Sequence, residues 1–225
     1  MRQIGRKYML GDMYMTKYRN LVRYAKRHNC TNEQFQYISN CIDNIFMLWC
    51  CRCKGADRED MIRGLVNVKG KGYTEALFGY CLHIVDDERI WKALANAKTP
   101  NAAEWKYHYC YYIKDRDEVW QALAQDRYAS KWHFDYYRLV KPRPEMISAL
   151  AMDLDNDAPE YQYKFCAIVK DNEIVWRSLA SNPNAAHWQL SYWIDVKKRP
   201  EMRDAILKSD DMHTIHQLRY WEDKS

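Results

Sequence analysis

The densest group of residues able to do chemistry is a set of cysteines near the N-terminal end of the chain. Cys50 and Cys53 have the spacing of a metal-binding pair, and Cys51 lies between them. A zinc site needs a second pair, for which only the irregular His28 and Cys30 are available upstream. Because cysteine also packs as a small apolar residue in helical cores, we expect neither a metal nor a cofactor.

Residue types common in catalysis are present, but they are not arranged as catalytic motifs. His108 and His133 have no Ser or Cys nucleophile in an activating motif beside them. His213 and His216 share a helical spacing but lack a third metal ligand. The chain has no phosphate-binding glycine motif. We therefore expect no catalytic residue and a function other than that of an enzyme.

Basic residues are concentrated at the N-terminal end. Residues 1–28 carry a formal charge of +7, whereas residues 29–225 sum to −2. Such an end can contact nucleic acid or an acidic protein, and it is equally typical of a solvated helix face. The candidate contact residues in this segment are Arg19, Arg23, Lys26 and Arg27.

A second basic set recurs along the chain at the ends of predicted helices. Stacked helices lie about 8–10 Å apart, so these side chains would form a positive ridge along one edge that phosphates could follow. The helix dipole also favours cations at such ends, which is the structural alternative. The set consists of Lys114, Arg116, Lys141, Arg143, Lys170, Lys197 and Arg199.

The elements that must position these residues repeat along the sequence. Segments such as KDRDEVWQALA and KDNEIVWRSLA are versions of one pattern, whose last strong apolar residue recurs every 27 to 29 residues. This column is Leu65, Leu94, Leu123, Leu150, Leu179 and Ile206. A second apolar stripe follows in each copy, and its first residues are Trp105, Trp132, Tyr161 and Trp188. Both stripes have helical spacing, so each copy is predicted to be a helical hairpin with these columns in its core.

One column of rings lies outside the predicted core stripe, two positions into each second helix. The rings could line a binding groove, or they could be buried between neighbouring helices. We expect at least Tyr107 and Tyr163 to be exposed, because their hydroxyls suit a wet surface. With one neighbour, the column supplies the candidate binding residues Phe78, Tyr107, Tyr111, Phe134 and Tyr163.

A single hairpin cannot bury both faces of its stripe, so the copies are predicted to stack. At LASNPNA, residues 179–185, and in related turns the chain resembles HEAT-like and leucine-rich-variant short helical repeats, over roughly residues 55–221. The resemblance implies a scaffold without specifying an activity. The expected fold is all-α: a right-handed α-solenoid of about six repeats in residues 55–225, with residues 1–54 as an atypical N-terminal helical cap.

The first residues lack the apolar run of a signal peptide, and no stretch of about 18 apolar residues occurs. The eight cysteines fit reduced thiols, so we expect a cytoplasmic protein without a membrane partner. The first functional hypothesis is a scaffold that grips another protein through the concave surface of its second helices. The alternatives are nucleic-acid binding through the same rings and lysines, and an enzyme resembling the HEAT-like DNA glycosylases. The partner and the oligomeric state do not follow from the sequence.

Overall fold

The computed structural model describes residues 62–63, 65–67, 73–83, 85–169 and 171–224. These residues form α-helices joined by short connections, and none of them belongs to a strand. The predicted all-α class is therefore confirmed for this part of the chain. The expected N-terminal cap, its boundary at residue 54 and the cysteines at 30 to 53 lie outside the described residues.

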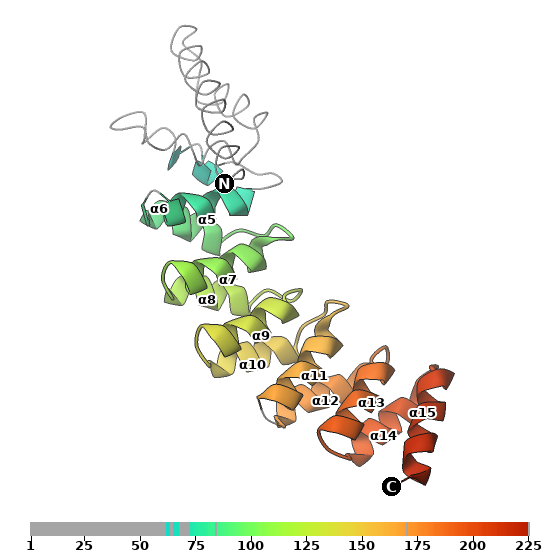
Figure 1. The fold of residues 1–225 in the computed structure, drawn as a ribbon. Helices are drawn as coiled ribbons and strands as arrows, with labels where there is room; N and C mark the ends of the chain where they lie inside the picture. The colour runs from blue at the N-terminus through green and yellow to red at the C-terminus, as the bar shows by residue number, and fades with distance from the viewer. Residues whose placement is uncertain (1–61, 64, 68–72, 84, 170, 225) are drawn as a thin grey trace, which may run out of the picture. The chain divides into compact units, whose positions relative to one another are not determined.

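The helices follow one another along the chain in alternating first and second positions of the predicted hairpins (Figure 1). Contacts divide the chain into two compact units, which are described separately: an N-terminal unit that ends at Trp120 and a C-terminal unit that begins at Gln121. The helices are α5 (Tyr73–His83), α6 (Glu88–Ala95), α7 (Ala102–Tyr112), α8 (Asp117–Ala124), α9 (Ser130–Leu139), α10 (Pro144–Ala151), α11 (Ala158–Ile168), α12 (Glu173–Ser181), α13 (Ala186–Asp195), α14 (Pro200–Lys208) and α15 (Met212–Asp223).

In the C-terminal unit the helices form two layers. Helices α10, α12 and α14 contact one another in series, and α9, α11, α13 and α15 do the same in a second series. Each helix also packs against the next one along the chain, as in α10 with α11 and α12 with α13. In the N-terminal unit, α5 packs against both α6 and α7. The second helices therefore lie beside one another within each unit, which brings residues about 28 positions apart into contact.

The core consists of the apolar columns predicted for the first helices. Side chains at one position are fully buried in each copy where the structure describes it: Ile90, Val119, Met146, Val175 and Met202. The leucine column is also buried from Leu65 to Ile206. Each such side chain contributes about 1.5–3 kcal/mol through the removal of apolar surface from water. Small residues in the same register, such as Ala149, are buried too and allow the neighbouring helices to approach closely.

The starts of α7 and α13 lack a side-chain capping hydrogen bond. Asn101 precedes α7 but makes no side-chain capping hydrogen bond, and the residue before α13 is Ala185. In the latter turn, Asn182 instead uses its side chain to accept from the backbone N–H of Asn184 at 2.9 Å. Side-chain caps occur before two first helices and before α15, where the acceptors are Asp87, Asn172 and Asp211.

Candidate binding surfaces

The predicted ring column is mostly core. Phe78, Phe134 and Tyr107 are buried, and Tyr107 has only 5% of its surface exposed. The expectation that Tyr107 lies on an exposed surface is therefore wrong. Tyr163 is half-buried, and its hydroxyl donates to Asp195 Oδ2 at 2.9 Å. Tyr111 is 46% exposed, and it stacks on Tyr107 with 5.9 Å between ring centroids.

Three of these rings, Phe78, Phe134 and Tyr163, pack against an aromatic ring of the next second helix. Phe78 lies 5.2 Å from Trp105 between ring centroids in the N-terminal unit. In the C-terminal unit the Phe134–Tyr161 distance is 5.8 Å and the Tyr163–Trp188 distance is 5.5 Å. Tilted ring pairs at such distances are favourable in addition to the apolar area that they bury. Two ring columns thus form an inner and an outer layer.

The outer layer consists of the residues that begin the second apolar stripe of each copy, which the sequence pattern predicts to be core. We call it the outer ring row, and its members are half-buried: Trp105, Trp132, Tyr161 and Trp188. Charged side chains of both signs border it in the C-terminal unit. The ammonium of Lys131 lies 4.4 Å from the Trp132 ring, and that of Lys164 lies 4.8 Å from the Tyr161 ring and pairs with Glu160. The row therefore offers flat apolar surface with cations and carboxylates beside it.

A buried polar column explains why Phe78, Tyr107 and Phe134 are buried although they lie outside the apolar stripe of the sequence. The residue that follows each member of the outer ring row is almost fully buried, although all four are polar: Lys106, His133, Gln162 and Gln189. His133 Nε2 lies 2.8 Å from the Leu123 carbonyl oxygen, and Gln162 and Gln189 donate to the carbonyls of Leu150 and Leu179 at 3.1 and 2.9 Å. The sequence signal was a column of polar residues with N–H donors in register, and His133, Gln162 and Gln189 bind the ends of the first helices.

Within this column, His133 forms a pair with the carboxylate of Asp153. Its Nδ1 lies 2.8 Å from Asp153 Oδ2, and both side chains are inaccessible to solvent. Burial raises the pKa of Asp153, and this effect exceeds the lowering that the hydrogen bond from His133 produces. Asp153 Oδ1 also accepts from the Ala129 backbone N–H at 3.2 Å, which ties the connection before α9 to the end of α10. The pair is a structural link, enclosed on all sides.

The arginines of the predicted basic edge point inward, toward an earlier copy. Arg116 Nε donates to the Tyr109 hydroxyl at 2.5 Å, and its Nη2 pairs with Asp86. The Tyr109 hydroxyl donates to Asp86 Oδ1 at 2.6 Å. The guanidinium also lies 4.8 Å from the Trp91 ring. We call this arrangement the Asp–Tyr–Arg bridge.

The same bridge recurs in the C-terminal unit. Arg199 pairs with Asp171 and donates to the Tyr192 hydroxyl at 2.8 Å, and its guanidinium lies 4.3 Å from the Trp176 ring. The hydroxyl of Tyr192 donates to Asp171. Arg143 likewise donates to the Tyr136 hydroxyl at 2.8 Å. The guanidinium groups of Arg116, Arg143 and Arg199 are thus held by the fold, so the interpretation of this column as a phosphate-binding edge needs correction at these three positions.

Electrostatics in the bridges follow from this geometry. Burial, followed by the hydrogen bond to the carboxylate, raises the pKa of Tyr109 and of Tyr192, so both phenols keep their protons and act as donors. Burial opposes ionisation of Asp171, but the hydrogen bonds from Tyr192 and Arg199 lower its pKa overall. The carboxylate is therefore charged at neutral pH.

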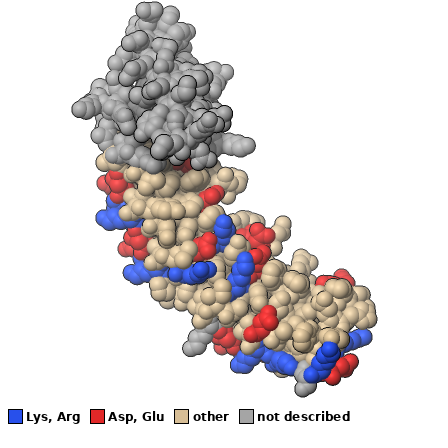
Figure 2. Space-filling view, viewed as in Figure 1, with Lys and Arg blue, Asp and Glu red and all other residues tan. Residues whose placement is uncertain are grey.

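The lysines of the predicted edge are exposed where the structure describes them: Lys114, Lys141 and Lys197. Lys197 lies 3.6 Å from Asp171, so part of its charge is balanced. Lys170 and the basic residues Arg19, Arg23, Lys26 and Arg27 lie outside the described residues. On the face shown in Figure 2, acidic and basic side chains are interspersed over each unit.

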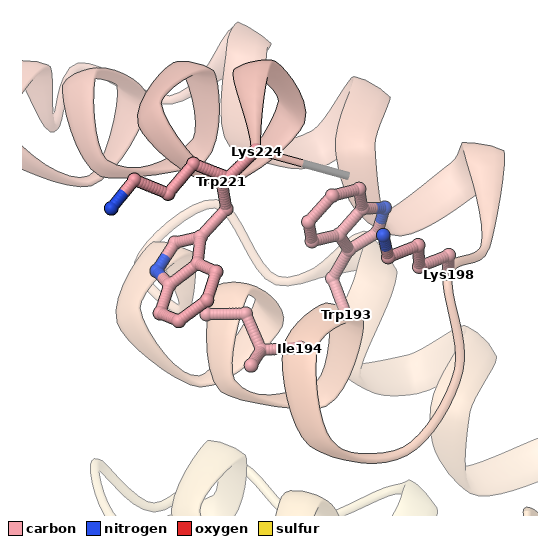
Figure 3. A pocket seen from close by; sticks show the side chains of 5 residues that line it. All are labelled: Trp193, Ile194, Lys198, Trp221 and Lys224. Atoms are coloured by element: carbon pink, nitrogen blue, oxygen red, sulfur yellow. The ribbon is translucent and has the colours of Figure 1, made fainter.

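A cavity of about 290 Å³ lies between the end of α13 and α15, and no pattern in the sequence predicts it. It is lined by Trp193, Ile194, Lys198, Trp221 and Lys224. Figure 3 shows the two indole rings extending from different helices toward the same space, with Ile194 beside them. Two lysines beside two tryptophans make this place chemically distinct from the outer ring row.

Comparison with known proteins finds no matching family model, curated protein or solved structure. Within the described residues, no group of three or more His, Cys, Asp or Glu side chains is arranged to hold a metal ion. No described helix has both the length and the apolar character needed to cross a membrane. Functional inference for this chain therefore depends on the geometry of its surfaces.

Proposed function

We propose that this chain is a non-enzymatic scaffold that binds another protein through the exposed face of its second helices. The observation that carries the proposal is the outer ring row. Trp132, Tyr161 and Trp188 lie on consecutive second helices of the C-terminal unit, each half-exposed, and the last two rest on a ring of the preceding helix. Aromatic side chains held in fixed positions, with mixed charges around them, are typical of protein interfaces.

The proposal includes the finer architecture expected from the sequence: a right-handed α-solenoid of about six repeats of 27 to 29 residues, with an N-terminal cap. The two series of helices in the C-terminal unit support it, because stacked hairpins produce such contacts. In that architecture, the second helices form the concave wall that faces the partner. The proposal also places the protein in the cytoplasm, which is supported by the buried thiols Cys81, Cys110 and Cys166.

A protein partner is favoured over nucleic acid by the charges beside the row. Nucleic-acid binding depends on cations that are available to neutralise phosphates. The arginines of the basic column are bound in Asp–Tyr–Arg bridges and to Tyr136, and the carboxylate of Glu160 borders the outer ring row. Nucleic-acid binding remains the second candidate because residues 1–28 carry +7.

The test is affinity capture with full-length variants from nuclease-treated extracts of the native cells. Trp188→Ala removes one outer ring, and Ile174→Ala is the matched control, because Ile174 is an exposed apolar side chain of α12, which is a first helix. We expect a discrete protein to be captured by the wild type and the control, and capture to fall about tenfold or more with Trp188→Ala. Equal capture by both variants, or a product that nuclease removes, would contradict the proposal. Circular dichroism of each variant establishes that the fold is retained.

A further inference from the structure

The cavity between α13 and α15 is separate from the outer ring row and has a different chemistry. We propose that it is a second binding site, which takes a short peptide segment bearing an acidic residue next to a bulky apolar one. This inference does not depend on binding at the outer ring row. It rests on the apolar walls of the cavity, on the two ammonium groups at its rim and on its size.

The apolar half of the site consists of two indoles and an aliphatic side chain. Trp193 is almost fully buried and forms a fixed wall, whereas Trp221 is 43% exposed and Ile194 is also exposed. Trp193 stands in a column that is occupied by Cys81, Cys110 and Cys166 in other copies. At this position α13 thus carries a large indole ring, as α9 carries Tyr137, whereas the other three second helices carry a small thiol. An apolar side chain that enters this space would cover surface that is now in contact with water.

The charged half consists of Lys198 and Lys224. Among the described residues, no carboxylate forms an ion pair with either of these two ammonium groups. Lys198 Nζ lies 4.9 Å from the Trp193 ring, whereas Lys224 Nζ lies 4.2 Å from the ring of Tyr220, outside the cavity lining, and donates to the hydroxyl of that tyrosine. Their neighbours differ, since Lys197 and Arg199 both contact Asp171. The cavity therefore has positive charge at its rim that a ligand carboxylate can balance.

Size and nearby charge define the ligand. A cavity of about 290 Å³ is slightly smaller than the pockets that enclose whole small-molecule ligands, which range from about 300 to 1,000 Å³, but it suits an anchoring side chain of a peptide. Asp195 and Asp223 are exposed on the same two helices, next to Ile194 and Lys224. A continuous run of phosphates would meet these carboxylates, whereas a single acidic residue can pair with one of the lysines. These features favour an acidic peptide over an oligonucleotide.

The experiment uses the full chain with 5-fluorotryptophan in place of tryptophan and follows ¹⁹F resonances. The Trp221 resonance is assigned by its loss in Trp221→Phe. The probes are a hexapeptide with a central leucine flanked by glutamates, the same peptide with lysines, the same peptide with alanine for leucine, and a six-residue oligothymidylate. We expect only the glutamate–leucine peptide to produce a saturable shift at Trp221.

Charge-reversal variants locate the contact. Lys198→Glu and Lys224→Glu should each weaken peptide binding about threefold to fivefold or more, and Trp221→Ala about tenfold. The matched control is Lys208→Glu, an exposed lysine of α14 outside the cavity, which should leave the affinity within a factor of about two. These variants change exposed side chains, so circular dichroism should show an unchanged fold.

Several outcomes would overturn the inference. They are equal binding of the lysine or alanine peptides, tighter binding of the oligothymidylate, or insensitivity of peptide binding to all three cavity variants. A Trp221 shift that depends on protein concentration alone would assign the cavity to a second copy of the chain and would also contradict the proposal. The Trp188→Ala capture experiment reports on the outer ring row, so a failure there is distinguishable from a failure here.

Discussion

The ring of Phe134 packs against the ring of Tyr161 with 5.8 Å between centroids, and it lies beneath that ring, away from solvent. Tyr163 and Trp188 make a similar ring contact one repeat later, but both of these rings are half-buried. In the Phe134–Tyr161 pair, one ring therefore belongs to the core and the other to the surface. Replacing the inner ring tests a structural role, and replacing the outer ring tests a binding role.

Truncation of an inner ring should destabilise the protein far more than truncation of an outer ring. Phe134→Ala removes a buried ring and leaves a cavity, so we expect the free energy of unfolding to fall by about 3–5 kcal/mol. Trp188→Ala removes a half-exposed ring and one ring contact, and we expect a loss of about 1–1.5 kcal/mol. Urea unfolding monitored by circular dichroism measures both. Equal losses would show that the two ring layers do not differ in burial.

The Asp–Tyr–Arg bridge predicts a pH-dependent contribution to stability. The pKa of Asp171 is lower in the folded protein than its usual value, so its contribution is complete above about pH 5 and is lost as the pH falls through the folded-state pKa. We expect Asp171→Asn to cost about 1–2 kcal/mol at pH 7, and the difference from the wild type to shrink below about pH 4. Urea unfolding between pH 3 and 7 tests this.

Asp204→Asn is the matched control for that series, because Asp204 is exposed on α14. Its effect on stability should be small and nearly independent of pH. If Asp171→Asn gave the same flat profile, the carboxylate would not be stabilised by Tyr192 and Arg199 as the geometry indicates.

Two thiols should resist alkylation in the folded protein. Burial raises the pKa of Cys81 and of Cys166 to about 12, so almost no thiolate exists at pH 8. We expect iodoacetamide at pH 8 to leave both unmodified under native conditions and to alkylate both in urea. Mass spectrometry of proteolytic peptides reads each site separately. Rapid alkylation of either thiol without denaturant would contradict its burial.

The buried polar column predicts a graded response at His133. His133→Ala leaves Asp153 buried without its histidine partner, and we expect a loss of about 3–5 kcal/mol. His133→Gln should cost less, because Gln162 and Gln189 hold the corresponding carbonyls elsewhere through their side-chain amides. Thermal unfolding of the two variants compares them. Identical losses would mean that the contact with the Leu123 carbonyl contributes little.

The sequence predicted the helical class and the core of the first helices because apolar residues recur there at helical spacing. In the second helices it predicted too narrow a buried face. Counting only apolar residues leaves out Lys106, His133, Gln162 and Gln189, which are buried and widen that face so that the inner ring column lies within it. Burial of these polar side chains depends on carbonyls at the ends of other helices, which periodicity does not report.

The arginine column was misinterpreted for a related reason: the partners of Arg116 and Arg199 lie 30 and 28 residues earlier in the chain. The sequence does contain a signal for this pairing. Asp, Tyr and Arg occur together in three copies, whereas the copy between the second and third has Pro142, Phe165 and Asn172 at the same three positions. Joint presence and joint loss of three residue types indicate that they interact. The cavity between α13 and α15 has no counterpart in other copies, so the repeat pattern could not reveal it.

The central claim, that the outer ring row contacts a protein partner, is tested most directly by photo-cross-linking in the native cells. A photoreactive phenylalanine analogue replaces Trp188 in one variant and Arg177, an exposed residue of α12, in another. We predict a discrete and reproducible protein adduct from position 188, which is absent from position 177 and resists nuclease. The same adducts from both positions, or none from position 188 in a folded and expressed variant, would contradict the claim.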